Sequence, residues 1–341
     1  MGQKRVSVIV PTYKRPLFLK RAINSVLCQN YDNIEILVVD DNNDGDQYRK
    51  ETEKVMAEYS GNAKVIYLKH KINSNGSAAR NTGLQNASGD YIAFLDDDDF
   101  FLNERIKSSV SFLDSSSSDI GGCCVNYIKK YKSLIYKRSE YDCVSSDCGN
   151  LLTGDVDYGA GSTLMIKRCV LDDVKGYDTT FRRHQDWEFL IRVFRNYKIV
   201  NLPILGVVIS ADGIRNNPNT DLLIEMKKKI FTEFDSSIKL LPESIYKNIL
   251  KGQRLEIVHS FLVRRKYSRA IDFYKSTDEQ GCVGIKDIPH LVLSLIVGLL
   301  PNFMVFVYWI YSLKYRGLNT VVENAEKKYS SKIVTIKHSG R

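Results

Sequence analysis

Apolar runs and amphipathic stretches alternate along the first half of the chain. Val6–Val10 is a short, nearly continuous apolar run ended by Pro11, which is the pattern of a buried parallel strand. Similar apolar runs follow at 34–39, 64–68 and 91–95. Between them apolar residues recur at three- and four-residue spacing, as in the helix face of Leu19, Ala22, Ile23, Val26 and Leu27. This alternation predicts a doubly wound α/β sheet.

The pattern changes in the second half of the chain. Runs at 120–129 and 131–138 are typical of a strand hairpin, so a mixed sheet is expected. From 221 to 276 the pattern is helical, and 288–313 contains no Asp, Glu, Lys or Arg. We therefore expect four regions, namely an α/β domain over 1–215, a helical extension over 216–287, an apolar segment over 288–316 and a C-terminal tail over 317–341.

Composition places the chain among folded globular proteins. Hydrophobic residues make up 43% and charged residues 26% of 341 residues, which excludes a disordered protein, a collagen-like fibre and a long coiled coil. The seven cysteines form no C-x-x-C pair, so a reducing compartment fits better than a disulfide scaffold or a zinc ribbon. A net charge of +9 fits an anionic lipid surface or a phosphate-rich substrate, and equally a merely solvated surface.

Four consecutive carboxylates, Asp96 to Asp99, follow the fourth apolar run. In open α/β sheets, ligands bind at the carboxyl ends of the strands. Four adjacent negative charges need a counter-cation or full solvation, and carboxylate oxygens suit Mg²⁺ or Mn²⁺. The alternate residues Asp96 and Asp98 could approach one metal, directly or through water. The other interpretation is a solvated acidic turn that caps the following helix.

Three further polar residues are candidates for the same site. Asp41 follows the second run, where an acidic side chain can accept hydrogen bonds from a base or ribose, although Asp-Asp-Asn-Asn also fits an Asx turn. Arg80 lies near the start of a helix opened by Gly76 and Ser77, and it could pair with a phosphate or be a solvated surface residue. Asp186 begins another helix and could be a cap or a general base.

The order of these motifs resembles the family 2 glycosyltransferases with the GT-A fold. The resemblance covers about residues 5–210. It rests on five stretches, which are Val6–Tyr13, Val38–Asn42, Ala79–Gly83, Ala93–Asp99 and Gln185–Trp187. It implies a Rossmann-like, doubly wound mixed sheet in a GT-A catalytic domain over 1–215, followed by a C-terminal helical region.

The resemblance also implies how a nucleotide sugar would be held. Pro11, Thr12 and Tyr13 would line the nucleotide pocket. Asp41 would contact the base, usually uracil, and Arg80 would lie near the diphosphate.

The remaining implied roles concern the metal and the reaction. Asp96 and Asp97 would contact the nucleotide sugar, and Asp96 and Asp98 would form the family's DxD element, with Asp98 as the direct ligand of Mn²⁺ or Mg²⁺. Asp186 would be the catalytic base. The residue before that base is often Glu in the family, and here it is Gln185.

We therefore expect an inverting, metal-dependent glycosyltransferase that moves a sugar from a nucleoside-diphosphate sugar, usually a UDP-sugar, to a hydroxyl of a glycan or lipid-linked acceptor in surface polysaccharide synthesis. One alternative is a nucleotidyltransferase, which would normally have a Gly-rich phosphate loop with a Lys near the first strand. Another is a non-catalytic nucleotide- or metal-binding module, which would not need Asp186. No nucleic-acid partner is expected, and a homo-oligomer is compatible with the sequence.

The apolar segment at 288–313 predicts association with a membrane surface. Its length approaches the roughly 20 residues of a spanning helix. Pro301 and Asn302 interrupt it, however, so two short helices in one leaflet are equally compatible, and so is a buried helix pair. Because Met1–Arg5 runs directly into the first apolar run, no signal peptide is expected. These observations favour a cytoplasmic enzyme at the inner face of the cell membrane.

Overall fold

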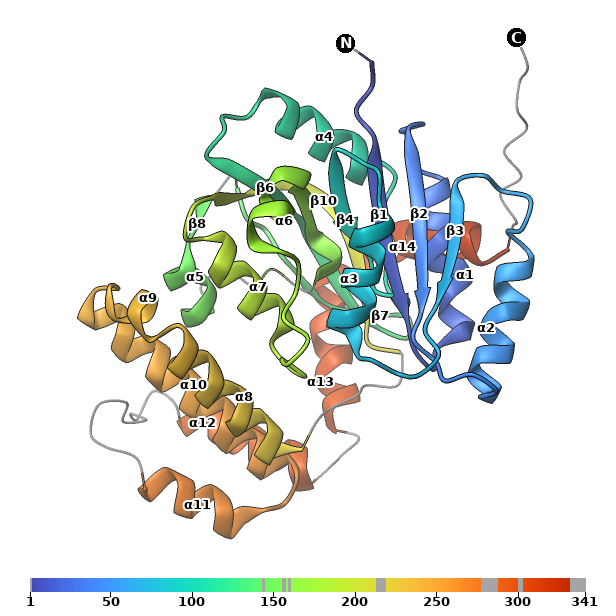
Figure 1. Ribbon diagram of the computed structural model, residues 1–341. Helices are drawn as coiled ribbons and strands as arrows, with labels where there is room; N and C mark the ends of the chain where they lie inside the picture. The colour runs from blue at the N-terminus through green and yellow to red at the C-terminus, as the bar shows by residue number, and fades with distance from the viewer. Residues whose placement is uncertain are drawn as a thin grey trace. The chain divides into compact units, whose positions relative to one another are not determined.

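The chain folds into two compact units, each assembled from segments that are distant in sequence (Figure 1). The computed structural model describes residues 2–142, 145–154, 158, 161–212, 219–276, 288–299 and 303–331. Unit 1 comprises Met1–Ser146, Tyr158–Arg215 and Ser312–Arg341. Unit 2 comprises Asp147–Asp157 and Asn216–Tyr311.

The described part of unit 1 contains one mixed sheet of ten strands. The strand order is β3-β2-β1-β4-β9-β6-β10-β5. Outside this order, β7 pairs with β6 and β8 pairs with β10. The strands are β1 (Val6–Thr12), β2 (Ile34–Asp40), β3 (Val65–Lys69), β4 (Tyr91–Phe94), β5 (Phe100–Phe101), β6 (Ile120–Tyr131), β7 (Leu134–Arg138), β8 (Ser145–Ser146), β9 (Leu164–Lys167) and β10 (Lys198–Ser210).

The strand directions bring several carboxyl ends to one edge of the sheet. β1 runs parallel to β2 and β4, and β2 runs parallel to β3. β9 is antiparallel to both of its neighbours, β4 and β6, so β6 and the parallel β10 regain the direction of β4. The last residues of four of these strands therefore lie at the same edge, and they are Thr12, Asp40, Phe94 and Ser210.

Helices cover both faces of the central strands, as their continuous apolar sequences require. Val6, Val8 and Val10 share a core with α1 (Pro16–Leu27), whereas Ile9, on the opposite face, contacts α3 (Gly76–Asn86). A Cβ on Gly83 of α3 would lie 2.5 Å from Ile9 Cγ2, so only glycine permits this close approach. The other helices of unit 1 are α2 (Gln47–Ala57), α4 (Arg105–Ser115), α6 (Arg168–Val174), α7 (Gln185–Val193) and α14 (Arg316–Ser331), with the 3-10 turns η1 (Gly161–Thr163) and η3 (Leu313–Tyr315).

Unit 2 is helical wherever it is described. Its longest helix, α10 (Glu243–Val263), contacts α5 (Cys148–Thr153), α8 (Thr220–Glu233), α11 (Tyr267–Lys275) and α12 (Ile288–Leu299). The unit also contains α9 (Asp235–Lys239) and most of α13 (Phe303–Ser312). Its core includes Leu223, Ile257, Phe261 and Ala270.

The apolar segment forms two separate short helices, α12 and α13, of 12 and 10 residues. Among the described residues, no helix combines the length and apolar character needed to cross a membrane. The interruption predicted at Pro301 and Asn302 lies outside the described residues, as does the part of the helical extension at 277–287.

Two segments pack with parts of the chain that are distant in sequence. Residues 147–154 belong to unit 2. The expected tail at 317–341 contains most of α14, whose residues Val322 and Tyr329 are buried with Phe100 of the sheet. The physical reason is a helix face with apolar residues at three- and four-residue spacing, Leu318, Val322, Ala325 and Tyr329. Residues 332–341 lie outside the described residues.

Candidate active site

The four carboxylates after β4 alternate between the protein interior and the surface. Asp97 and Asp99 are 0% and 2% exposed, whereas the side chains of Asp96 and Asp98 are 27% and 14% exposed. The backbone amide of Asp99 donates to the Asp96 carbonyl at 3.0 Å, so the run forms a tight turn. This acidic turn, Asp96–Asp99, therefore has two partly exposed carboxylates, Asp96 and Asp98, and two buried ones, Asp97 and Asp99.

Asp97 connects the acidic turn to the end of β1. Its Oδ2 accepts a hydrogen bond of 2.7 Å from Thr12 Oγ1, and its Oδ1 lies 3.0 Å from Arg15 Nε. Arg15 also pairs with the neighbouring Asp98 through Nη1. Burial raises the pKa values of Asp97 and Asp98 above the ordinary value, and the Arg15 guanidinium opposes this rise.

Asp99 connects the same turn to the other half of the sheet. It accepts hydrogen bonds of 2.6 Å from Ser162 Oγ and of 3.0 Å from the Ser210 amide. Ser162 Oγ in turn accepts from the Asp96 amide at 3.0 Å. Burial, together with the charges of Asp98 and Asp96, raises the pKa of Asp99 well above its ordinary value.

Arg80 joins the acidic turn to the start of α7. Its Nη2 donates a hydrogen bond of 2.8 Å to Asp96 Oδ1, and its Nη1 donates one of 3.1 Å to Gln185 Oε1. The guanidinium carbon lies 5.5 Å from the centre of the Tyr177 ring. Burial acts to lower the pKa of Arg80, but the carboxylates of Asp96 and Asp186 raise it above the ordinary value. One buried cation therefore serves two carboxylates from different elements.

Asp186 is held inside the first turn of α7 and is not its cap. The N-cap is His184, whose φ of 56° lies in the left-handed region and which makes no side-chain cap bond. Asp186 Oδ1 is buried and accepts no hydrogen bond from the described residues. Burial raises the pKa of Asp186, Arg80 opposes the rise and Asp96 adds to it. A buried carboxylate with a raised pKa is suited to accept a proton.

Gly161 borders the space beside these two groups. A Cβ built on it would lie 3.4 Å from Asp186 Oδ1 and 3.8 Å from Arg80 Nη2. A methyl group would fit at those distances, whereas a larger side chain would fill the space next to both the carboxylate and the guanidinium.

Asp41 organises the segment that follows β3. Its Oδ1 accepts hydrogen bonds of 2.7 Å from His70 Nδ1 and 2.8 Å from the Ser74 amide, and its Oδ2 accepts one of 2.7 Å from Asn73 Nδ2. The other ring nitrogen of His70 lies 2.8 Å from Thr82 Oγ1 of α3. Burial raises the pKa of Asp41, and the bonds from Ser74 and His70 oppose the rise.

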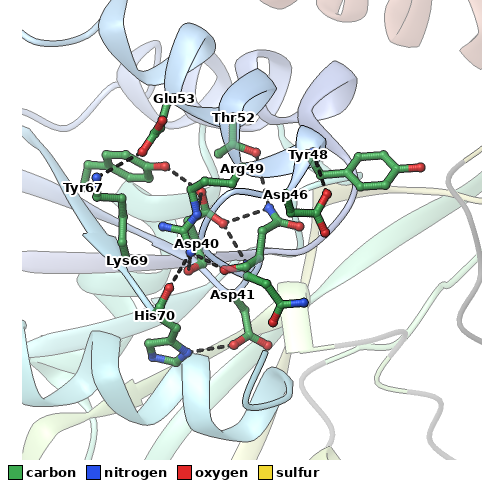
Figure 2. A network of polar contacts seen from close by, with 12 residues as sticks. Asp40, Asp41, Asp46, Tyr48, Arg49, Thr52, Glu53, Tyr67, Lys69 and His70 are labelled. Carbon is green, nitrogen blue, oxygen red and sulfur yellow. Dashed lines mark hydrogen bonds and ion pairs between the residues drawn. The ribbon is translucent and has the colours of Figure 1, made fainter. Parts of the chain in front are cut away.

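A second network lies directly beside Asp41, as Figure 2 shows. Asp40 is fully buried, pairs with Arg49 Nε at 3.4 Å and accepts a hydrogen bond from the Tyr67 hydroxyl. The Asp41 amide donates to the Thr12 carbonyl at 2.9 Å, which joins this region to the end of β1. Pro11 and Tyr13 flank Thr12 and are half-buried.

Comparison with known proteins assigns the family. Residues 7–175, about half of the chain, match the family model described as Glycosyl transferase family 2. The chain belongs to glycosyltransferase family 2. An uncharacterized glycosyltransferase of Rickettsia prowazekii is 24% identical over 335 residues, which are 94% of this chain and 95% of that relative. Four other curated relatives, 29% to 38% identical, are matched over only 18% to 44% of their own lengths.

Two solved structures share the fold of this family 2 member. S. aureus TarS 1–349 in complex with UDP-GlcNAc has a TM-score of 0.55 and 17% identity, covering 96% of this chain and 88% of that one. The mannosyltransferase PcManGT from Pyrobaculum calidifontis, in complex with GDP-Man and Mn²⁺, has a TM-score of 0.52 and 17% identity, covering 94% and 88%. At these identities the likeness concerns the fold, and the predicted GT-A-type mixed sheet with a C-terminal helical region is confirmed.

The acidic turn of this family 2 member fits the divalent cation that the sequence predicts. Asp96 and Asp98 offer hard carboxylate oxygens on partly exposed side chains, and each has an arginine partner that balances its charge. In the described part of the chain, no three His, Cys, Asp or Glu side chains converge on a metal position. Mg²⁺ commonly takes one or two protein carboxylates and completes its shell with substrate phosphates and water. The donor set therefore fits an ion that binds together with a diphosphate.

The structure adds three residues that the sequence analysis did not single out. Arg15 pairs with the acidic turn, Ser162 bonds two residues of it, and Tyr177 lies under Arg80. Arg15 could have been predicted from the sequence, because a basic residue that follows β1 lies at the same edge of the sheet as the acidic run that follows β4. Ser162 and Tyr177 reach the site from η1 and from the loop before α7, and no motif marks them.

Proposed function

We propose that this family 2 member is an inverting, metal-dependent glycosyltransferase. It transfers a sugar from a UDP-sugar to a hydroxyl of a glycan or lipid-linked acceptor in surface polysaccharide synthesis. The observation that carries the proposal is the position of Arg80, which is hydrogen-bonded to Asp96 and borders the same space beside Gly161 as Asp186. The proposal therefore groups a cation for a diphosphate, two partly exposed carboxylates and a base in one site.

In this proposal Asp186 accepts the proton of the acceptor hydroxyl. The acceptor oxygen forms a bond to the anomeric carbon while the bond from that carbon to the diphosphate oxygen breaks, and the nucleoside diphosphate leaves with the bonding electrons. Because attack and departure occur on opposite sides in one displacement, the configuration inverts. General-base assistance of this kind contributes about 10²–10⁴-fold in rate. No carboxylate nucleophile is needed.

The diphosphate end of the donor meets Arg80 and the acidic turn. A divalent cation, Mn²⁺ or Mg²⁺, would neutralise the negative charge that develops on the leaving diphosphate. Asp98 and Asp96 would hold it. Arg80 offers a planar guanidinium whose geometry suits phosphate oxygens, and this guanidinium packs over the ring of Tyr177.

The base end of the donor would lie near Asp41, Thr12, Pro11 and Tyr13. Asp41 is held in place by three donors, which fixes its carboxylate beside the end of β1. The UDP-GlcNAc in the TarS complex supports a uracil nucleotide, and the GDP-Man in the other similar structure shows that a guanine nucleotide must be tested beside it.

A lipid-linked acceptor at the cytoplasmic face of the membrane is part of the proposal. Gly298 of α12 faces α10, since a Cβ on it would lie 2.4 Å from the Leu262 carbonyl oxygen. Arg265 Nε donates to the Gly298 carbonyl at 2.7 Å, which brings the exposed basic run 264–266 to the same end of α12. Apolar side chains next to cations suit an anionic lipid surface. Among the side chains of α12 that the structure describes, the large apolar ones left exposed are Val292, Leu293, Leu295 and Leu299.

The test is release of nucleoside diphosphate from a panel of UDP-sugars and GDP-mannose, with Mn²⁺ or with EDTA. We expect release from a UDP-sugar only with metal. Asp186→Asn should lower it by about 10²-fold or more while UDP binding in calorimetry is retained. Asp98→Ala should weaken metal-dependent binding of UDP, and exposed Asp32→Asn is the matched control. Absence of release from every donor, or full activity of Asp186→Asn, would contradict the proposal.

The membrane part has its own test, which is sedimentation of the protein with vesicles that contain anionic lipid. Leu293→Glu should reduce co-sedimentation. Recovery of the wild type in the supernatant with neutral and anionic vesicles alike would contradict this part alone.

A further inference from the structure

The C-terminal helix α14 delivers one carboxylate to two buried cations of unit 1. Glu326 pairs with Arg21 of α1 through Oε1, and both of its oxygens accept hydrogen bonds from Lys130 Nζ of β6, at 2.8 and 2.7 Å. The side chains of Arg21 and Lys130 are only 6% and 4% exposed. Because buried charges are strongly unfavourable without partners, Glu326 stabilises both cations. Lys130 has a second carboxylate partner, Asp212 Oδ2 at 3.5 Å, whereas Glu326 is the carboxylate that pairs with Arg21.

Arg21 connects the same glutamate to the acidic turn. Its Nη2 donates to the backbone carbonyl of Asp98 and, at 3.1 Å, to Ser210 Oγ. Its guanidinium carbon lies 4.9 Å from the centre of the Phe100 ring, next to the turn in sequence. Nη1 is directed to Glu326, so the two ends of one planar group join α14 to the turn.

Ser210 provides a second connection between Arg21 and the acidic turn. Its hydroxyl accepts from Arg21, while its amide donates to Asp99 Oδ1 at 3.0 Å. Movement of the Arg21 guanidinium would therefore disturb both the Asp98 carbonyl and the anchor of Asp99. These are the backbone and the inner carboxylate of the turn that carries Asp96 and Asp98.

We propose that Glu326 is a positioning residue, which acts through Arg21 to hold the Asp96–Asp99 turn in the arrangement that binds the donor diphosphate. The effect on the turn depends only on the contacts above, and the effect on donor binding rests also on the proposed function. Glu326 lies far outside residues 7–175, the part of the chain matched by the family model.

The test compares three variants of the full chain. Glu326→Gln keeps the size of the side chain and removes its charge. Glu323→Gln, on an exposed position of the same helix, is the matched control. Tyr329→Phe removes the 2.7 Å hydrogen bond from the Tyr329 hydroxyl to Asn103 and so weakens the docking of α14 without touching Arg21.

The first readout is amide hydrogen exchange, which needs neither metal nor donor. We expect Glu326→Gln to speed exchange of the amides at 96–101 by roughly ten-fold, since local opening sets these rates. Glu323→Gln should leave them unchanged, and Tyr329→Phe should act mainly on the amides of α14. Unchanged exchange at 96–101 in Glu326→Gln, or an equal increase in Tyr329→Phe, would overturn the proposal.

The second readout is calorimetric binding of UDP with Mn²⁺. We expect roughly ten-fold weaker binding in Glu326→Gln, because a displaced turn loses a charge-assisted contact, and wild-type binding in Glu323→Gln. Faster exchange with unchanged binding would overturn the functional half of the inference. A wild type that binds no nucleotide would contradict the proposed function instead, and the exchange result would still decide whether Glu326 holds the turn.

Discussion

Arg80 Nη2 lies 2.8 Å from Asp96 Oδ1, and this pair joins α3 to the turn after β4. The same guanidinium balances Asp186, which comes from α7 more than a hundred residues later. In the proposed function, a donor diphosphate would therefore meet an arginine already oriented by two carboxylates and an amide. Little rearrangement is needed for such a group to exchange a carboxylate contact for a phosphate contact.

Replacement of this arginine is expected to affect binding and proton transfer together. Arg80→Met should lower kcat/KM by about 10²-fold, because one oriented, desolvated cation is lost from the site. The pKa of Asp186 should rise further, since the charge of Arg80 opposes its rise. Arg80→Lys keeps the charge without the planar fork and should be intermediate.

Steady-state kinetics and UDP calorimetry check this prediction, and circular dichroism confirms that the variants fold. Arg182→Met, at an exposed position before α7, serves as the control. Arg80→Met with kcat/KM within a few-fold of wild type would show that Arg80 is a structural group.

The ring and the hydroxyl of Tyr177 should have separable effects. The ring stacks on Phe189 with centres 4.5 Å apart, contacts Phe94 edge-on at 5.4 Å and supports Arg80. The hydroxyl is buried and makes no hydrogen bond to the described residues. Tyr177→Phe should therefore retain stability and turnover, whereas Tyr177→Ala should lose about 3–5 kcal/mol of unfolding free energy.

Urea unfolding and donor kinetics of the two variants check this prediction. A large fall in kcat for Tyr177→Phe, with unchanged unfolding, would instead assign the hydroxyl a contact with the substrate.

Glu35 should make stability depend on pH below neutrality. Its carboxylate accepts hydrogen bonds of 2.5 Å from Ser7 Oγ and 2.6 Å from the Ser88 amide, and it lies 2.9 Å from Arg5 Nη2. Burial acts to raise the pKa of Glu35, but these partners together lower it below its ordinary value of 4.5. Because the folded pKa is the lower one, the stabilisation is present above 4.5 and is lost as pH falls through the folded pKa.

Urea unfolding at several pH values measures this effect. At pH 7, Glu35→Gln should be less stable by about 1–3 kcal/mol, because hydrogen bonds to a charged group are lost. The difference from wild type should shrink as pH falls below 4.5. The exposed Glu323→Gln should follow wild type throughout, and a constant difference at all pH values would contradict the assignment.

The central strands could be predicted because their sequence alone requires burial. The runs at 6–10, 34–39, 64–68 and 91–95 correspond to β1, β2, β3 and β4 with shifts of at most two residues at an end. The rule that ligands lie at the carboxyl ends of such strands also placed the acidic run and Asp41 at one edge. Local pattern and a general property of α/β sheets were enough for this part.

The partners of those residues could not be predicted in the same way. Asp97 and Asp98 share Arg15, and Asp96 shares Arg80 with Asp186, so these contacts depend on how separate elements meet. Nothing in a run of four identical residues shows that alternate members point inward. The role of α14 was missed for a related reason. Its apolar residues are spaced among charged ones, and the surface of unit 1 on which they pack forms only after folding.

The order in which the chain is synthesised has a consequence for unit 1. The 216–311 segment of unit 2 precedes α14 in the chain, so a ribosome makes all of unit 2 before Glu326 can reach Arg21 and Lys130. A gene fragment that stops at residue 215 includes the whole stretch matched by the family. It removes the carboxylate that pairs with Arg21, leaves Lys130 with Asp212 and not Glu326, and uncovers the surface that Val322 and Tyr329 bury. A fragment designed to keep unit 1 intact should therefore include α14.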